Sequence, residues 1–505
     1  MADRDGDLVS YYQNLAVAVW QGTPRYAEIP PFHPSVRYPE YDLGAVGSES
    51  NPAYEGVRAC LQLLGLDREH FGTSEWNPFQ EIVKPGNNVV IKPNFVLSRH
   101  FEGGELFAII THPSVLRAIV DYVYKALHGE GKITIADAPQ MDCDFDELLV
   151  ATHLSAIQDL YWEQHRFDIA ILDLRDFWLN AQPGDKAAYS DRREPLPGDP
   201  LGSVLVSLGK RSAFYGVDSC SKFYGADYNR KETIAHHHDD VHEYLISRTI
   251  LNSDVIISVP KFKVHKKVGV TLNAKGLVGI NTNKNYLVHY TLGTPDEGGD
   301  QFPAHLLSHR ERLLVKAKRF FFDSLLSHRN KKADKVYDAI GNIYRAGVKP
   351  WLGGVEPTKM NLDGGNWYGN DSAWRMVVDM MRVILFADAD GGLSDVPQRR
   401  MFSVLDGIVG GENNGPLTPD AKRAGLIAAG FNLLAVDIVG ARLMGFDWRK
   451  LKWIQHLLND GCWGHEDEIQ VVSGNTAFRE ALSSGERLLD FKPHPGWRDY
   501  IEVHG

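Results

Sequence analysis

The sequence has few cysteines, and their spacing does not suit a metal cluster. Cys60, Cys143, Cys220 and Cys462 are scattered along the chain without a C-x-x-C pair. This spacing excludes the usual iron-sulfur clusters and structural zinc sites, which need clustered thiolates. We therefore expect reduced and mostly buried thiols, and no iron-sulfur cluster.

The chain also lacks a long uninterrupted apolar run. Its longest apolar stretch, residues 424–445, is broken by Asn432, Asp437 and Arg442, and residues 430–432 resemble a turn. This pattern favours a buried strand and helix over a membrane span. The first residues of the chain are acidic, where a signal peptide would be basic. We expect a cytoplasmic protein without a transmembrane segment.

Several common nucleotide-binding and hydrolase motifs are missing. No G-x-G-x-x-G follows the first expected strand, and neither G-x-x-x-x-G-K-[ST] nor G-x-S-x-G occurs. These absences disfavour the usual dinucleotide binding, P-loop phosphoryl transfer and serine hydrolase chemistry. The net charge of -11 and the pI of about 6.0 argue against nucleic acid as a partner, because such partners require a broad basic surface.

What the chain does have is a globular composition, with 43% hydrophobic residues in 505. Short β-branched runs alternate with amphipathic stretches, a pattern typical of parallel sheets covered by helices. We expect an α/β fold with a mainly parallel sheet and two α/β lobes separated by a cleft. The expected units are an N-terminal extension packed on the body (1–80), a first lobe (81–300), a helical insertion (301–350), and a second lobe with C-terminal elements (351–505).

One β-loop-α-β unit is especially clear. We expect a strand at 88–92, a helix at 113–127 and a strand at 132–136. The carboxyl ends of parallel strands meet at one edge of a sheet, and ligands bind at that edge. Lys92, Asn94 and Asp137 follow these two strand ends, so they become candidate substrate-binding residues. Further along we expect a helix at 240–251, strands at 254–259 and 401–405, a helix at 372–385 and a loop at 406–416.

Residues 255–295, here called the basic segment, contain no aspartate or glutamate although the chain has 65 acidic residues. Lysines without carboxylate partners suit a phosphate or carboxylate ligand that supplies the negative charge. Crowded cations also lower each other's pKa, which activates a lysine as a base or nucleophile. Apolar residues between the cations indicate partial burial, whereas the alternative is a solvated surface loop. The cations are Lys261, Lys263, His265, Lys266, Lys267, Lys275, Lys284 and His289.

A histidine-rich run precedes this segment. On a helix, His238 and His242 would share one face, as metal ligands do. No third ligand stands at a diagnostic spacing, and a helix start capped by Asp239 or Asp240 explains the run equally well. A catalytic histidine is a third alternative, and we retain His242 as a candidate ligand contact.

Two polar loops provide further candidates. The loop 365–371 contains Asn370 and Asp371 and leads into a helix bearing Arg375. The loop 406–416 contains Glu412 and Asn414. Such side chains orient a ligand or hold a cation, although both loops could equally be turns with local hydrogen bonds.

Several motifs occur in a characteristic order: Ile91-Lys92-Pro93-Asn94, Thr111-His112-Pro113, Pro260–His265, Lys275–Gly279, Asp406–Pro416, Ala435-Val436-Asp437 and Arg442–Gly445. This order resembles the bacterial and archaeal family called domain of unknown function 362, over roughly residues 85 to 450. Some members carry ferredoxin-like cysteine clusters that imply redox partners, but this chain lacks those cysteines. The early β-loop-α unit is also similar to the amino-terminal domain of nickel-dependent lactate racemase, in which lysine and histidine serve a small carboxylate substrate.

We expect an enzyme that acts on a small anionic metabolite by lysine and histidine acid-base chemistry, isomerase-like or redox-like, with the reaction class left open. Lys261, Lys263 and Lys275 would neutralise the anion, and His265 or His289 would transfer protons. A second hypothesis is a group-transfer enzyme or ligase with a nucleotide or phosphorylated donor and a divalent cation. A third is a non-catalytic anion sensor, or a protein that contacts membranes through an amphipathic helix at 309–335.

Overall fold

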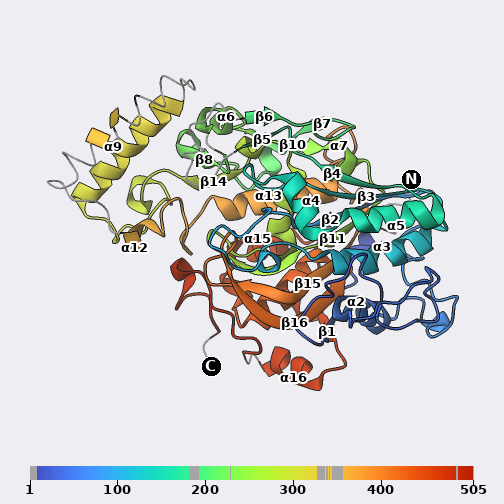
Figure 1. The fold of residues 1–505 in the computed structure, drawn as a ribbon. Helices are drawn as coiled ribbons and strands as arrows, with labels where there is room; N and C mark the ends of the chain where they lie inside the picture. Colours follow the sequence, from blue (N-terminus) through green and yellow to red (C-terminus); the bar gives the residue numbers. More distant parts are fainter. Residues whose placement is uncertain are drawn as a thin grey trace.

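The computed structural model describes residues 8–180, 193–227, 229–326, 336, 339–340, 342–343, 357–484 and 487–503. The fold is α/β, built on one large mixed sheet in which most neighbouring strands are parallel (Figure 1). The strand order is β17 (Gln470–Val472), β1 (Ala16–Gln21), β16 (Asp420–Gly430), β15 (Arg400–Glu412), β11 (Val255–Val259), β2 (Asn88–Pro93), β3 (Lys132–Asp137) and β4 (Ile169–Asp173).

The centre of this sheet is buried on both faces. Strand β11 has the sequence VIISV, and all five of its residues are buried between β2 and β15. Continuous apolar runs of this kind are typical of parallel strands covered by helices on both sides. A further strand, β12 (Lys261–His265), follows β11 almost immediately and pairs with β15 and with β13 (Gly269–Val270). The first cations of the basic segment therefore lie at the carboxyl edge of the sheet.

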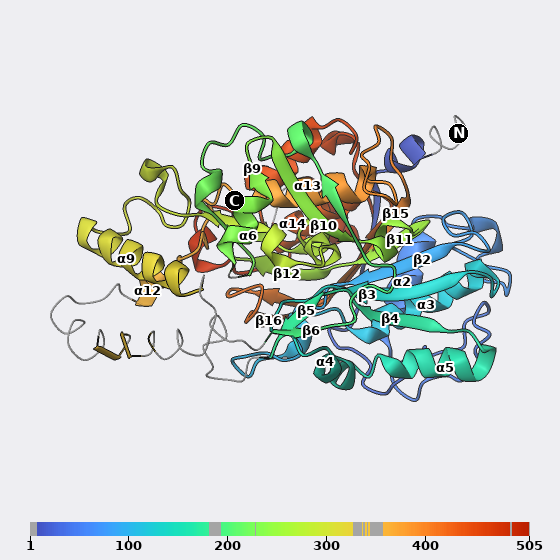
Figure 2. The ribbon, with the colours of Figure 1, turned by 90° about the horizontal axis from the view of Figure 1, so that it is seen from above.

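Helices pack on the two faces of the sheet around two hydrophobic cores (Figure 2). One face carries α2 (Pro52–Leu63), α3 (Pro113–Leu127), α4 (Phe145–Thr152) and α5 (Ser155–His165). The other carries α8 (Leu272–Gly276), α13 (Ala373–Phe386), α14 (Leu433–Met444) and α15 (Lys452–Asn459). Helix α3 begins where expected, because the His112 ring accepts the Ser114 N–H and Pro113 occupies the first turn.

Smaller elements surround this body. Three minor sheets are formed by β7 (Ser203–Ser207), β10 (Val241–Ser247) and β9 (His237–His238), by β14 (Val288–Thr291) and β8 (Phe223–Gly225), and by β5 (Phe177–Leu179) and β6 (Arg193–Pro195). The other α-helices of the described residues are α6 (Arg230–Ala235), α7 (Arg248–Leu251), α9 (His309–Leu326), α12 (Pro357–Met360) and α16 (Thr476–Ser484). Helix α9 projects from the body (Figures 1 and 2).

The expected helix at 240–251 is wrong over most of its length. Residues 241–247 form strand β10, and only 248–251 are helical. The alternation of half-buried and buried residues along β10 is a period of two, which suits a strand pairing with β7. His238 and His242 therefore lie on paired strands of a hairpin instead of one helical face.

The expected strand 401–405 and loop 406–416 also need correction. Strand β15 continues to Glu412 and pairs with β16, so most of the expected loop is strand. A shift in register between Gly407 and Val409 lets this long strand bend. The apolar stretch 424–445 is a buried strand followed by a helix, as predicted.

The expected domain units are joined more closely than their boundaries suggest. Strand β1 of the N-terminal extension lies inside the large sheet, and strands from both expected lobes are hydrogen-bonded in it. Most of the helical insertion beyond residue 326, including 327–335 of the amphipathic segment, lies outside the described residues. Among the described helices, none combines the length and apolar character that crossing a membrane requires.

Candidate functional site

The carboxyl edge of the sheet carries a buried ion pair. Lys92, near the end of β2, donates to Asp137 at the end of β3, with Nζ and Oδ1 2.8 Å apart. The other Asp137 oxygen accepts the Phe95 backbone N–H at 2.6 Å. Because β2 and β3 are adjacent and parallel, the sheet itself brings these residues together. The pair forms one side of the site.

A cavity of about 250 Å³ opens beside this ion pair, and the basic segment supplies much of its wall. Strand β12 and the turn after it contribute four side chains, and α8 and β14 contribute others. The lysine and histidine residues of the wall are Lys263, His265, Lys266, Lys267, Lys275, Lys284 and His289. We call this space the basic cavity. Asp137 is the one acidic residue among its described lining residues, and it is already paired with Lys92.

Lys275 differs from the other buried lysines of the cavity, Lys263 and Lys284, in its surroundings. It is only 8% exposed, and its ammonium group has neither a hydrogen bond nor an ion pair with the described residues. Burial lowers the pKa of Lys275 to about 7. The charge of Lys275 also lowers the pKa of Lys263, His265, Lys267, Lys284 and His289, so it lies at the electrostatic centre of the cluster. A ligand in the cavity would meet an unpaired amine.

Three other cavity lysines are held by carbonyl groups. Lys263 donates to the Ile109 carbonyl at 2.5 Å, and Lys267 donates to the Gly364 carbonyl and to Asn366. Lys284 donates to three carbonyl oxygens, the nearest that of Ala138 at 2.7 Å. Burial is the main cause that lowers the pKa of each of these lysines, to about 7 for Lys267 and Lys284. Their positions are therefore fixed by the backbone.

The two cavity histidines are fixed in opposite tautomers. His265 Nδ1 accepts the backbone N–H of Lys267 at 3.1 Å, so the neutral ring carries its proton on Nε2. His289 Nδ1 lies 3.0 Å from the Leu287 carbonyl, which can only accept, so Nδ1 carries the proton and Nε2 is an acceptor. Burial, with Lys275 as the leading charge, lowers both pKa values well below 6.5. One ring is thus a donor and the other a base.

Two polar atoms on the cavity wall lack partners. The Asn94 side-chain oxygen and the Thr271 hydroxyl are buried and have no hydrogen bond among the described residues. Buried polar groups are usually satisfied, and leaving one unpaired costs about 1–3 kcal/mol. Thr271 lies one helical turn before Lys275, whose backbone N–H donates to the Thr271 carbonyl. Both residues line the same cavity as Lys275.

Lys261 lies outside this cavity although it belongs to the same segment. Its Nζ donates to Asp406 Oδ2 at 2.8 Å and to the Tyr26 hydroxyl at 2.7 Å, and both charged side chains are fully buried. Residues two apart on a regular strand point to the same face, but a shift in the register with β15 separates Lys261 from Lys263. Lys261 therefore connects β12 to β15 and does not line the cavity.

The other expected binding residues also lie elsewhere. His242 faces its hairpin partner His237 and packs against Phe214, with ring centroids 5.9 Å apart. Glu412 accepts the Lys492 backbone N–H, and Asn414 donates to Thr418. Neither side chain lines the basic cavity, although the neighbouring Pro416 and Leu417 do.

The loop before α13 is built by local hydrogen bonds. Asn370 accepts the Ser372 and Ala373 N–H groups and donates to the His289 carbonyl. Asp371 pairs with Arg375 at 2.9 Å and with Lys452 at 3.0 Å. Asn370 thus supports the strand that carries His289, while Asp371 and Arg375 bind each other at the surface.

Some wall residues were not singled out as site residues from the sequence. Lys266, Lys267 and Lys284 belong to the basic segment. The sequence alone does not show which of these lysines line a site, because the partners of each side chain depend on the fold. Others follow strand ends or come from distant loops, and no local motif marks them: Phe95, Val96, Gln140, Gly225, Tyr290 and Leu417. Proximity to Asn94 and Asp137 in sequence would have indicated the first three.

The described residues contain no group of three or more His, Cys, Asp or Glu side chains arranged to hold a metal ion. Asp137 is committed to Lys92, and the expected cation ligands Asp371 and Glu412 lie in separate places with other partners. The cavity's donor set is dominated by amines and imidazoles, which suits an anion better than a hard cation.

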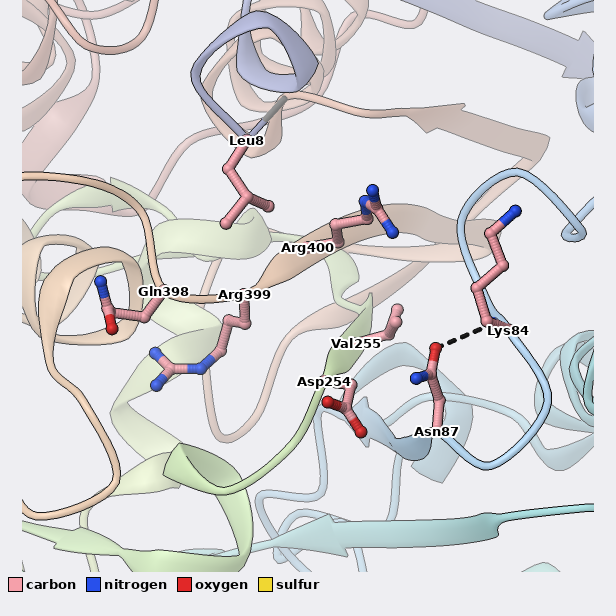
Figure 3. A pocket seen from close by; sticks show the side chains of 8 residues that line it. All are labelled: Leu8, Lys84, Asn87, Asp254, Val255, Gln398, Arg399 and Arg400. Carbon is pink, nitrogen blue, oxygen red and sulfur yellow. Dashed lines mark hydrogen bonds between the residues drawn. The ribbon is translucent and has the colours of Figure 1, made fainter. Parts of the chain in front are cut away.

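A smaller cavity of about 80 Å³ lies at the opposite edge of the sheet, where β11 and β15 begin (Figure 3). Its polar groups serve the fold. The Asn87 side chain accepts the Lys84 N–H, and Asp254 accepts the Asn88 N–H. Arg399 donates to carbonyls at the end of α13, including Ile384. We therefore place the candidate site in the basic cavity.

The chain was compared with known protein families, curated proteins and solved structures. The family described as domain of unknown function (DUF362) matches residues 89–161 and 199–442. These two ranges contain every residue that lines the basic cavity, from Asn94 to Leu417. No curated protein and no solved structure matches the chain.

Proposed function

The chain belongs to the DUF362 family, whose description names no reaction, and we propose from its basic cavity that it is an enzyme acting on a small anionic metabolite. The ligand is a carboxylate or a phosphate, and lysine and histidine side chains transfer protons on it. The cavity volume of about 250 Å³ lies below the roughly 300–1,000 Å³ of typical drug-sized ligand pockets, which favours a small metabolite over a nucleotide.

Lys275 is the observation that carries this proposal. Burying an unpaired ammonium ion costs several kcal/mol, so the group must lose its proton or gain an anionic partner. The described cavity wall offers no free carboxylate, because Asp137 is paired with Lys92. An anionic ligand supplies the missing charge and binds several fixed cations at once.

The arrangement of the two histidines favours a catalysed reaction over ligand binding alone. His265 presents a proton on Nε2, and His289 presents an unprotonated Nε2. A donor and a base that flank a buried amine allow a proton to be removed from one position of a substrate and delivered to another. An anion sensor would need the lysines but not this arrangement.

A binding titration tests the proposal. Calorimetry at constant ionic strength, with oxalate, malonate and inorganic phosphate as probes, should show saturable binding at pH 7 that Lys275→Met abolishes. Lys452→Met removes a surface lysine paired with Asp371 and is the matched control. Equal weak binding by all three proteins would contradict an anion site in this cavity. Binding of nucleotides only with magnesium would instead favour a group-transfer enzyme.

We also propose that α9 makes reversible contact with a membrane surface. Leu313 and Phe320 are 68% and 77% exposed, and their spacing of seven residues places them on one face of the helix. Arg312 and Lys316 pair with Asp296 and Glu297 of the body, so the helix is anchored while these apolar side chains meet solvent. Exposed large apolar side chains on an amphipathic helix are typical of interfacial segments.

A further inference from the structure

The described part of the chain brings together what a carbonyl substrate with an adjacent carboxylate would need. Its elements are an unpaired buried amine, nearby cations fixed by carbonyls, one ring that donates and one that accepts. Simple anion binding requires only the cations. The amine at the centre of the cluster and the two opposed tautomers need a separate explanation.

We propose that Lys275 forms a Schiff base with a 2-oxo carboxylate, an inference that rests on the proposed function and names its substrate class. The carboxylate is held by fixed cations such as Lys263 and Lys284, and the neighbouring carbonyl carbon lies against Lys275 Nζ. Lysines that react in this way are desolvated or placed beside other cations, and Lys275 is both.

The amine is available in its nucleophilic form. With a pKa lowered by burial to about 7, a substantial fraction of Lys275 is neutral at pH 7. A solvent-exposed lysine would be almost entirely protonated at the same pH. Lys267 and Lys284 have similarly lowered pKa values, but their nitrogens donate to carbonyl groups and are held in place. Among the buried lysines of the described cavity wall, Lys275 is the one whose nitrogen has no partner; Lys266 also lacks a partner but is only half-buried.

The chemical steps balance without an oxidant or reductant. The Nζ lone pair forms a bond to the carbonyl carbon while the His265 Nε2–H hydrogen-bonds to the developing oxyanion. His289 Nε2 removes a proton from the nitrogen and delivers it to that oxygen, giving a neutral carbinolamine. A proton from solvent on the hydroxyl lets the C–O bond break, and water leaves as the C=N bond forms. The sum is amine, ketone and one proton giving a protonated imine and water.

Two partnerless oxygens belong to residues that line the same cavity. The Thr271 hydroxyl lies one helical turn before Lys275 and can bond to the carbinolamine hydroxyl. The Asn94 side-chain oxygen can accept a proton-bearing group of the same intermediate. A protonated imine also draws electrons from the neighbouring carbon, so a C–H bond there becomes acidic. This connects the adduct with the proton transfer proposed for the histidines.

Chemical trapping tests the inference. The full chain is incubated with pyruvate and sodium cyanoborohydride, and intact mass spectrometry and peptide mapping locate the reduced adduct. We expect one adduct, on Lys275, which oxalate suppresses by occupying the anion site. Lys275→Arg keeps the cation but has no nucleophilic amine, and it should bind oxalate without forming the adduct.

The outcomes separate this inference from the proposed function. If the wild-type protein binds oxalate but yields no adduct at Lys275, the Schiff base is wrong and the anion site stands. If it neither binds oxalate nor forms the adduct, both proposals fail. Adducts spread over surface lysines and unchanged by oxalate overturn the Schiff base as well. Peptide mapping of the wild-type protein gives these results even if Lys275→Arg does not fold.

Discussion

Lys92 and Asp137 meet at the ends of two adjacent parallel strands, with 2.8 Å between Nζ and Oδ1 and both side chains only 2% exposed. Gly279 packs directly on this pair. A Cβ at position 279 would lie 1.7 Å from Asp137 Oδ1 and 2.7 Å from Lys92 Nζ. The absence of a side chain at 279 thus allows the ion pair to form.

Gly279→Ala should therefore separate the ion pair. We expect a loss of about 3–5 kcal/mol in unfolding free energy, because two charges become buried without their partner. Gly276→Ala is the matched control in the same segment, since the nearest atom to its new Cβ is 3.9 Å away. Urea denaturation of both variants measures the difference. Equal stability of the two would contradict the close packing on Asp137.

A second prediction concerns Lys261, which the sequence suggested as a catalytic residue. Its charge is paired with Asp406 between β12 and β15. We expect Lys261→Met to destabilise the fold by about 3–5 kcal/mol, because the buried Asp406 carboxylate loses its opposite charge and is left with hydrogen bonds from uncharged donors such as the Tyr26 hydroxyl and the His112 backbone N–H. Lys261→Met with Asp406→Asn should recover part of this loss. Calorimetry should show unchanged oxalate binding by the folded double variant, and loss of that binding would place Lys261 in the site.

The sequence predicted the sheet edge well because that prediction depends on local patterns. Apolar runs located β2, β3 and β11, and parallel strands necessarily bring Asn94 and Asp137 to one edge. The absence of acid within the basic segment did not reveal the partners of its lysines: several are carbonyl oxygens, and Lys261 pairs with Asp406 from a distant strand.

The remaining site residues could not be ranked from the sequence, because their environments depend on distant contacts. Lys261 and Lys263 are two residues apart, yet one meets Asp406 and the other the Ile109 carbonyl. The helix expected at 240–251 failed because pairing with β7 favours a strand there. Asn370 lies in a polar loop and Glu412 ends strand β15, and the hydrogen bonds that each makes depend on the folded backbone.

The histidines provide a third prediction. In His289→Asn the amide nitrogen can still donate to the Leu287 carbonyl, but the base at Nε2 is lost. We expect exchange of the pyruvate methyl protons in D₂O, followed by NMR, to slow by about 10²–10⁴-fold while oxalate binding persists. His265→Asn keeps an acceptor for the Lys267 N–H and removes the Nε2 donor. Exchange at the wild-type rate in His289→Asn would exclude this ring as the base.

Helix α9 gives a fourth prediction. Leu313→Ser with Phe320→Ser removes the two exposed apolar side chains without touching the Arg312 or Lys316 ion pairs. We expect the wild-type protein to co-sediment with vesicles of phosphatidylcholine and phosphatidylserine, and the double variant to stay in the supernatant. Val150→Ser, which removes another exposed apolar side chain, is the control. If all three proteins sediment alike, or none does, α9 is not the contact.

The last prediction uses two lysines that have the same lowered pKa for the same main reason. Burial lowers the pKa of Lys275 and of Lys284 from 10.5 to about 7. Between pH 7 and 10 the unfolded chain holds a proton on each lysine that the folded chain releases, so unfolding free energy rises with pH in this window. Below pH 7 both states are protonated, and the cost of burying the charge is present in full.

Replacement should nevertheless affect the two lysines in opposite directions. Lys275 has no partner among the described residues, so Lys275→Met removes a cost and should raise the melting temperature at pH 7, by an amount that shrinks toward pH 10. Lys284 donates to three carbonyl oxygens, and Lys284→Met leaves them unpaired at about 1–3 kcal/mol each. It should therefore lower the melting temperature throughout. Thermal melts of both variants from pH 6 to 10 measure these two effects. If Lys275→Met is as destabilising as Lys284→Met, the Lys275 amine has a structural partner in the fold and is not held free for a ligand.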